Sequence, residues 1–132
     1  MMQFTEKAIQ QTFQDMLTEM PFDKITVSAL VRRCGISHNT FYYHYDDIYD
    51  FLKHWLQLII GDVLSEQMDG GWHENIRVGL HLCKDNSEIV YHLFNGISRD
   101  RLERYIFTAS KDVFEKYVRE HAKDRGVSED LI

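Results

Sequence analysis

The chain has 132 residues and a mass of 15.7 kDa, which suits one domain or one compact unit of two sub-bundles and excludes a multidomain enzyme. Hydrophobic residues make up 44% of the sequence and charged residues 27%, a composition that can bury a core and differs from that of disordered chains. The formal net charge of −6 makes the molecule as a whole repel polyanions. Any nucleic-acid binding must therefore come from a confined patch.

Cysteine content and the N-terminal sequence indicate a cytoplasmic protein. The two cysteines, Cys34 and Cys83, are too few for a disulfide framework and have no C-x-x-C spacing. His81 and Cys83 fall on different sides of a helix and no His-x-x-x-His pair occurs, so we expect no metal site and no cofactor. The N-terminus lacks the regions of a signal peptide, and polar residues interrupt the apolar run over 56–64, so no membrane span is expected.

Helical periodicity runs through the chain and strand-like alternation is hard to find, so the sequence predicts an all-α fold. An apolar stripe predicts a first helix over residues 5–19, which ends before Pro21. Asp46 and Asp47 favour the start of a long helix that follows them. Beyond a flexible connection at residues 69–72, further helices are expected over residues 74–84, 87–97 and 99–124, and Ser128 would cap another.

Two short helices are predicted between the first helix and the long one. Thr26 is a suitable N-cap for the first of them, and Gly35 suits the left-handed position that ends it. Ser37 can then cap a helix over residues 38–45. Two short helices joined by a three-residue turn form a helix-turn-helix, a unit that places its second helix in the major groove of DNA.

A helical wheel divides residues 38–45 into an inner and an outer side. Phe41 and Tyr45 fall on the inner side. The outer side carries donors, acceptors and aromatic edges, namely Asn39, Thr40 and Tyr43, with Tyr42 and His44 on its flanks. This chemistry suits contact with base edges and phosphates.

The segment from Thr26 to Tyr45 contains two arginines, Arg32 and Arg33, and no acidic residue. A locally positive surface inside an acidic protein is typical of a phosphate-binding patch. For each arginine, and for His44, two interpretations stay open: a phosphate contact, or a solvated helix face.

This segment resembles the DNA-binding signature of the TetR/AcrR family of bacterial transcriptional regulators, over the run TVSALVRRCGISHNTFYYHYDDIYDFL. The resemblance depends on the spacing of Gly35, Ser37, Thr40, Phe41, Tyr42 and Tyr45. Within the family, the later region HLC…N…IVYHLFNGISRDRLERYI is similar to the branch that contains the dihydroxyacetone kinase operon regulator. The resemblance implies a DNA-binding domain over residues 1–46 and an effector-binding and dimerisation domain over residues 47–132 that lacks the family's last helices.

The resemblance also implies roles for individual residues. Thr26 would bind a phosphate, Thr40 and Tyr43 would lie on the base-reading side, and Tyr42 and His44 would hold backbone phosphates. Asn39 could, by its own chemistry, read an adenine edge. The full set of DNA-binding candidates is Thr26, Ser28, Arg32, Arg33, Ser37, His38, Asn39, Thr40, Tyr42, Tyr43 and His44.

We therefore expect a TetR-like regulator that binds a palindromic double-stranded DNA operator as a homodimer, with a DNA affinity modulated by a small effector. An ordinary helical core is one interpretation of the C-terminal helices, and the other is an effector pocket lined by some of Trp55, Ile59, Trp72, His81, Tyr91, Phe94 and Tyr105. No catalytic constellation is present, so an enzyme is not expected.

One departure from the family pattern supports an alternative function. Where the family usually has a phosphate-binding lysine, this chain has Ile48, beside Asp46, Asp47 and Asp50. The alternative is a coregulator of the same fold that acts mainly through protein contacts, with weak or no DNA binding. A protein that sequesters a small ligand is a third, less favoured reading.

The last predicted helix carries more apolar residues than one core face needs. Phe107, Phe114 and Val118 form a second apolar set, separate from the one that begins at Leu102. We expect the first set to face the core and the second to face a partner.

Overall fold

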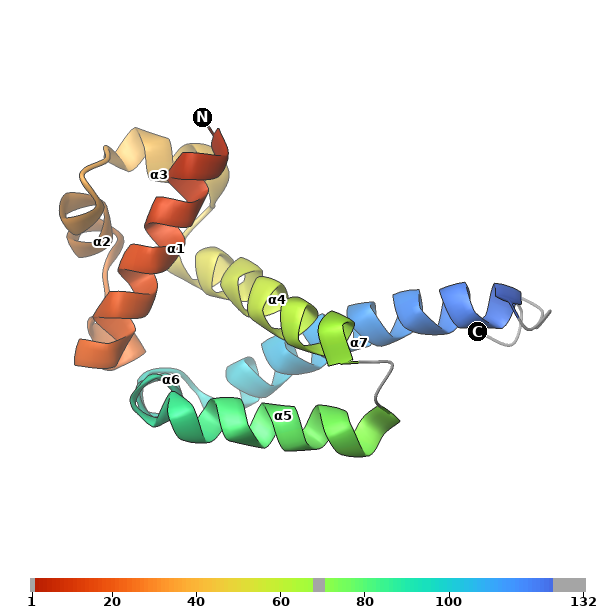
Figure 1. Cartoon of the computed structure of the whole chain (residues 1–132). Helices are drawn as coiled ribbons and strands as arrows, with labels where there is room; N and C mark the ends of the chain where they lie inside the picture. Colours follow the sequence, from red (N-terminus) through yellow and green to blue (C-terminus); the bar gives the residue numbers. More distant parts are fainter. Residues whose placement is uncertain (1, 68–70, 125–132) are drawn as a thin grey trace.

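The computed structural model describes residues 2–67 and 71–124, and every element in these ranges is helical, as predicted (Figure 1). Side chains are described for residues 4–62, 73, 74, 76–116 and 118–120. The elements are α1 (Met2–Glu19), the short 3-10 helix η1 (Phe22–Lys24), α2 (Val27–Cys34), α3 (His38–His44), α4 (Ile48–Gln67), α5 (Gly71–Asp85), α6 (Ser87–Gly96) and α7 (Arg99–Asp124).

Several details of this order differ from the sequence prediction. The first helix begins at Met2 rather than at residue 5, and α6 ends at Gly96, one residue before its predicted end. The connection expected over residues 69–72 is shorter, because α5 already begins at Gly71; the first turn of a helix tolerates glycine better than its interior does. The η1 turn was not predicted, since three residues carry no periodicity that a sequence pattern can show. The further helix expected after Ser128 lies outside the described residues.

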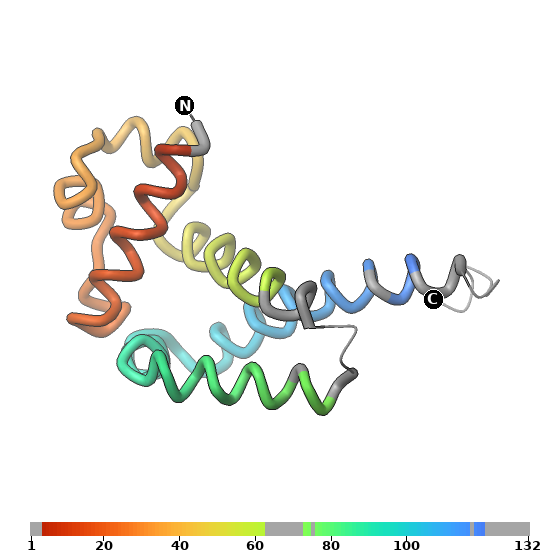
Figure 2. The backbone as a smooth tube through the Cα atoms, viewed as in Figure 1, coloured from red at the N-terminus to blue at the C-terminus, as the bar shows by residue number. Residues whose placement is uncertain are grey.

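The helices form two groups that α4 and α6 connect. Figure 1 shows α1, α2 and α3 together at one end, with α4 leading away from them beside α7. The contacts agree, because α1 packs on α2, and α4 packs on both α5 and α7. Figure 2 shows the chain returning through α6 to the end of α1, and α6 contacts both α1 and η1.

One continuous core links the two groups, and an aromatic cluster forms its centre. The Phe51 ring of α4 lies 4.9 Å from the Phe13 ring of α1 and 4.8 Å from the Tyr45 ring, between ring centroids. Phe41 of α3 lies 6.1 Å from Phe51. Because Phe13, Phe41 and Phe51 are all fully buried, these contacts hold α1, α3 and α4 in a fixed relation. From α6 and α7, Ile89, Leu93 and Leu102 join the same core.

The group formed by the C-terminal helices α5, α6 and α7 leaves large apolar side chains on its surface. On α7, Phe107, Phe114 and Val118 are exposed, whereas Leu102 is buried, so the two expected apolar sets do face different ways. On α5 and α6, Leu80, Tyr91 and Phe94 are also exposed. These faces are not covered by any described part of the chain.

The aromatic core predicts that two aromatic residues of α3, Phe41 and Tyr43, contribute very differently to the free energy of unfolding. Phe41→Ala should lower the free energy of unfolding by about 3–5 kcal/mol, because it removes a fully buried ring and leaves a cavity. Tyr43→Ala, at a side chain that is 73% exposed, should change it by less than about 0.5 kcal/mol. Urea denaturation followed by circular dichroism measures both values, and similar losses at the two positions would contradict the packing described here.

Candidate nucleic-acid interface

Local hydrogen bonds define both ends of α2 as the sequence predicts. The Thr26 hydroxyl accepts a hydrogen bond of 3.1 Å from the Ala29 backbone N–H and thereby caps the start of the helix. Gly35 adopts φ +80°, and its N–H donates to the Val31 carbonyl at 2.9 Å. The left-handed turn at Gly35 then redirects the chain toward α3.

The start of α3 is capped in the same way, by Ser37. Its hydroxyl accepts from the Thr40 backbone N–H at 3.1 Å and lies 3.0 Å from the Thr40 hydroxyl. The helix ends at His44, one residue before the predicted end, because Tyr45 is already extended, with φ −138°, and its ring packs into the core. Burial of Phe41 and Tyr45 confirms the predicted inner side of this segment.

The outer side of α3 presents the side chains that the helical wheel placed there, with the exceptions of Thr40 and His44. His38 and Asn39 are exposed, Tyr43 is 73% exposed and Tyr42 is 51% exposed. Thr40 differs, since its side chain is half-buried and its hydroxyl contacts Ser37. The accessible surface of α3 therefore consists mainly of the Asn39 amide and two phenol rings.

A side-chain hydrogen bond joins α2 to α3 beside this surface. Ser28 Oγ lies 3.0 Å from His38 Nε2, so the exposed starts of the two helices are connected directly. Arg32 follows Ser28 by one helical turn and lies on the same side of α2. Its side chain is exposed and makes no ion pair with any other described residue, so its guanidinium is available to an anion.

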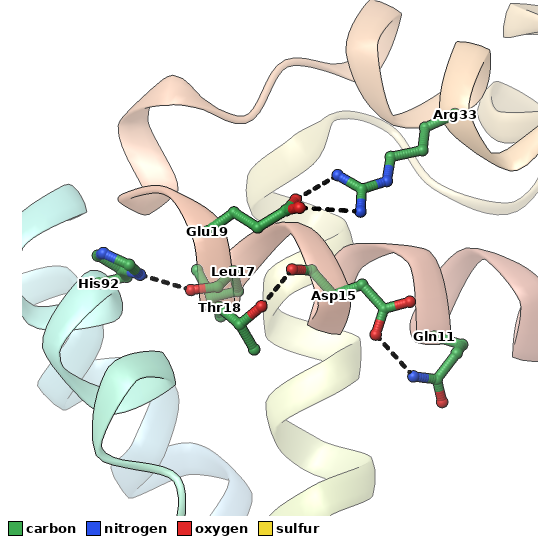
Figure 3. Close-up of polar contacts among 7 residues, drawn as sticks. All are labelled: Gln11, Asp15, Leu17, Thr18, Glu19, Arg33 and His92. Carbon is green, nitrogen blue, oxygen red and sulfur yellow. Dashed lines mark hydrogen bonds and ion pairs between the residues drawn. The ribbon is translucent and has the colours of Figure 1, made fainter.

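The other arginine of α2 has a partner. Arg33 binds the Glu19 carboxylate with two nitrogens, and the Nη2–Oε1 distance is 3.2 Å (Figure 3). Figure 3 also shows a second chain of contacts along α1, in which Gln11 donates to Asp15 and the Thr18 hydroxyl donates to the Asp15 carbonyl. The Arg33 guanidinium is therefore held against the end of α1 by an exposed ion pair, and a phosphate contact of Arg33 stays a prediction.

His44 also turns back to α1. Its Nδ1 lies 3.2 Å from the Glu6 carboxylate, and its side chain is only 10% exposed. Burial raises the pKa of the neighbouring Tyr45 phenol, and the negative charge of Glu6 adds to this effect. In this conformation the imidazole is largely covered and has an anionic partner, and the phosphate contact of His44 stays a prediction.

These contacts reduce the positive charge that the sequence predicts for this surface. Between Thr26 and Tyr45 the chain has no acidic residue, but α1 supplies Glu19 to Arg33 and Glu6 to His44. Sequence reasoning missed both pairings, because the partners belong to a different helix and the local sequence carries no sign of them. The exposed cation that remains on α2 is Arg32.

Acidic residues that follow α3 are used to start α4. The Asp47 carboxylate accepts from the Asp50 N–H at 2.7 Å, and the Asp50 carboxylate accepts from the Asp46 N–H at 2.9 Å. Negative side chains at the positive end of a helix are stabilising, so these residues form the start of α4 as expected.

The candidate effector residues differ in their burial. Trp55 of α4 is buried and Tyr105 of α7 is half-buried against the core. By contrast, Ile59, His81, Tyr91 and Phe94 are exposed, and the side chain of Trp72 lies outside the described ones. The candidate set therefore includes both core residues and surface residues, and an effector pocket lined by some of them stays a prediction.

Comparison with protein-family models, curated protein sequences and solved structures gives no match. Within residues 2–67 and 71–124, no helix is long and apolar enough to cross a membrane. Among the side chains that the structure describes, no group of three or more His, Cys, Asp or Glu is arranged to hold a metal ion.

The pairing of α1 with α2 predicts a shifted titration. The hydrogen bond from Arg33 holds the pKa of the Glu19 carboxyl below its usual value. Because the folded-state pKa is lowered, the stability that this pair contributes is present at neutral pH and is lost as the pH falls through that lowered value. Arg33→Ala should return the Glu19 pKa toward its usual value in an NMR titration of the side-chain carboxyls.

The Glu74–Arg77 pair on α5 provides the control. The hydrogen bond from Arg77 lowers the pKa of Glu74 in the same way. Arg77→Ala should therefore raise the pKa of Glu74 and leave that of Glu19 unchanged. An unchanged Glu19 titration in Arg33→Ala would show that the two side chains are not paired in solution.

Proposed function

We propose that this chain is a TetR-like transcriptional regulator that binds a palindromic DNA operator as a dimer. In this proposal α2 and α3 form the helix-turn-helix of an N-terminal DNA-binding domain, and α3 is the recognition helix that enters the major groove. The C-terminal helices carry dimerisation and the response to a small effector. The same proposal places the protein in the bacterial cytoplasm.

The exposed side of α3 carries this proposal. Asn39 and Tyr43 project from a helix that Phe41 anchors in the core, so two groups capable of hydrogen bonds with base edges stand on a rigid element. If these side chains had been buried and Phe41 exposed, the proposal would have no basis. Sequence resemblance and side-chain exposure support the same interpretation.

Phosphate contacts have fewer candidates than the sequence suggests. The Thr26 hydroxyl accepts from Ala29, and its own hydrogen can still donate to a phosphate oxygen. Arg32 supplies a positive charge on the side of α2 that carries Ser28, whose hydroxyl contacts His38 of α3. Tyr42 adds an exposed phenol at the flank of α3. These groups would position the protein on DNA, and Asn39 and Tyr43 would select the sequence.

A second candidate function is a coregulator of the same fold that acts mainly through protein contacts. One observation favours it: α1 carboxylates occupy Arg33 and His44, which leaves few cations on the proposed DNA surface of an acidic protein. The exposed apolar residues of α5, α6 and α7 would then contact a protein partner.

Selection of duplexes from a random library by the full chain distinguishes the two functions. A regulator should enrich a palindromic sequence, whereas a coregulator should enrich none. Tyr43→Ala should then reduce the preference for the selected operator over random DNA by about 1–3 kcal/mol, because it removes a base contact. Tyr43→Phe separates the contribution of the hydroxyl from that of the ring. Equal loss on operator and random DNA would show that Tyr43 does not read bases.

Arg32 should affect DNA binding in a different way. Arg32→Ala should weaken binding to operator and random DNA alike, and should reduce the slope of log K against log salt by about 0.9 for one lost phosphate contact. Arg119→Ala is the charge-matched control, since it removes an exposed arginine near the C-terminal end of α7, which Figure 1 shows far from α2 and α3. Equal slopes for the two variants would exclude Arg32 as a phosphate ligand.

A further inference from the structure

The last residue of α6 lies unusually close to the backbone of η1. Gly96 is buried, and a Cβ atom at this position would lie 2.3 Å from the Phe22 nitrogen and 2.7 Å from the Asp23 nitrogen. Real Cβ atoms do not approach backbone atoms so closely, and backbone cannot move aside as a flexible side chain can. Close approach of α6 to η1 therefore requires glycine at position 96.

One turn earlier, α6 supplies a hydrogen bond that α1 cannot make for itself. In a regular helix, the carbonyl of Leu17 would accept from the N–H of residue 21, but Pro21 has no N–H. His92 Nδ1 lies 2.6 Å from this carbonyl in a partly buried position, which Figure 3 shows at the end of α1. The imidazole thus satisfies an acceptor that the proline leaves without its helical donor.

The start of α7 holds the same region from a second side. The Arg101 guanidinium lies 4.2 Å from the centroid of the Tyr49 ring, and Tyr49 in turn packs on Phe22 at 5.6 Å. We call this region the α6 junction, and it consists of Leu17, Phe22, His92 and Gly96. Because η1 is separated from the Thr26 cap of α2 by one residue, the α6 junction lies directly beside the segment that connects α1 to α2.

We infer that His92 and Gly96 are positioning residues that fix the α1–α3 group against the C-terminal helices, and thereby set the distance at which two subunits present α3 to DNA. The claim that these residues set the distance between two α3 helices on DNA rests on the proposed function. The mechanical part, that they fix α1–α3 against the C-terminal helices, does not rest on it, since it concerns contacts within one chain. Neither residue lies on the exposed side of α3, so neither would contact DNA itself.

Hydrogen exchange on the full chain tests the mechanical part without DNA. Gly96→Ala should speed amide exchange over residues 17–25 by about tenfold or more, because contacts worth at least one hydrogen bond are lost there. Gly79→Ala is the matched control: it adds the same methyl to a helical glycine where the structure describes no neighbouring heavy atom within 4 Å. Equal exchange over residues 17–25 in the two variants would overturn the inference.

Variants of His92 keep the inference testable if Gly96→Ala does not fold. His92→Leu removes the donor to the Leu17 carbonyl and should speed exchange over the same residues. His92→Asn retains an N–H donor at the branch position that Nδ1 occupies, and should restore slower exchange. Equal exchange in His92→Leu and His92→Asn would show that the hydrogen bond to Leu17 does not fix α1.

The DNA part needs operators that differ in half-site separation. Starting from the operator selected by the full chain, duplexes with one base pair added or removed at the centre should bind more weakly than the original. In Gly96→Ala, or in His92→Leu, this preference for one separation should fall about tenfold, while binding to a single half-site stays unchanged. An unaltered preference would overturn the spacing role. If the wild-type chain enriches no DNA, the proposed function fails, and hydrogen exchange still decides whether the α6 junction fixes α1.

Discussion

Packing around the Phe51 ring is the contact on which the arrangement of this protein depends. The ring meets Phe13 of α1, Phe41 of α3 and the Tyr45 ring, and each of these side chains is buried. A helix as short as α3 is not stable alone in water, so its position comes from this anchorage. The exposed direction of Asn39 and Tyr43 is therefore a consequence of the core beneath them.

Features that depend on neighbouring residues in the sequence could be predicted well. The caps at Thr26 and Ser37 and the left-handed turn at Gly35 each involve groups no more than four residues apart. The buried side of α3 also follows from the helical period, which fixes Phe41 and Tyr45 on one face. For these elements local chemistry and tertiary packing favour the same conformation, which is why periodicity and capping rules were sufficient.

Contacts between distant segments could not be predicted in the same way. Glu19 precedes Arg33 by 14 residues, and His92 follows Leu17 by 75. In the sequence Arg33 and His44 have the chemistry of phosphate ligands, and only the position of α1 shows that carboxylates already occupy them. Pro21 predicts the end of the first helix, and α1 ends at Glu19. The donor that pairs with the Leu17 carbonyl, by contrast, comes from α6 and is a property of the packed molecule.

The distribution of charge also bears on how such a protein could achieve specificity. Most of the affinity of nonspecific DNA binding comes from cations on phosphates, and here α1 carboxylates occupy two of the basic groups near α3. A regulator with few phosphate contacts must gain more of its binding free energy from base contacts and from the correct separation of two recognition helices, which are also the terms that discriminate between sequences. The base contacts depend on the surface of α3 that Phe41 anchors. The separation of the two recognition helices depends on the close approach to η1 that Gly96 permits at the end of α6. In such a molecule, a methyl group at position 96 would matter more for operator choice than the loss of a surface charge.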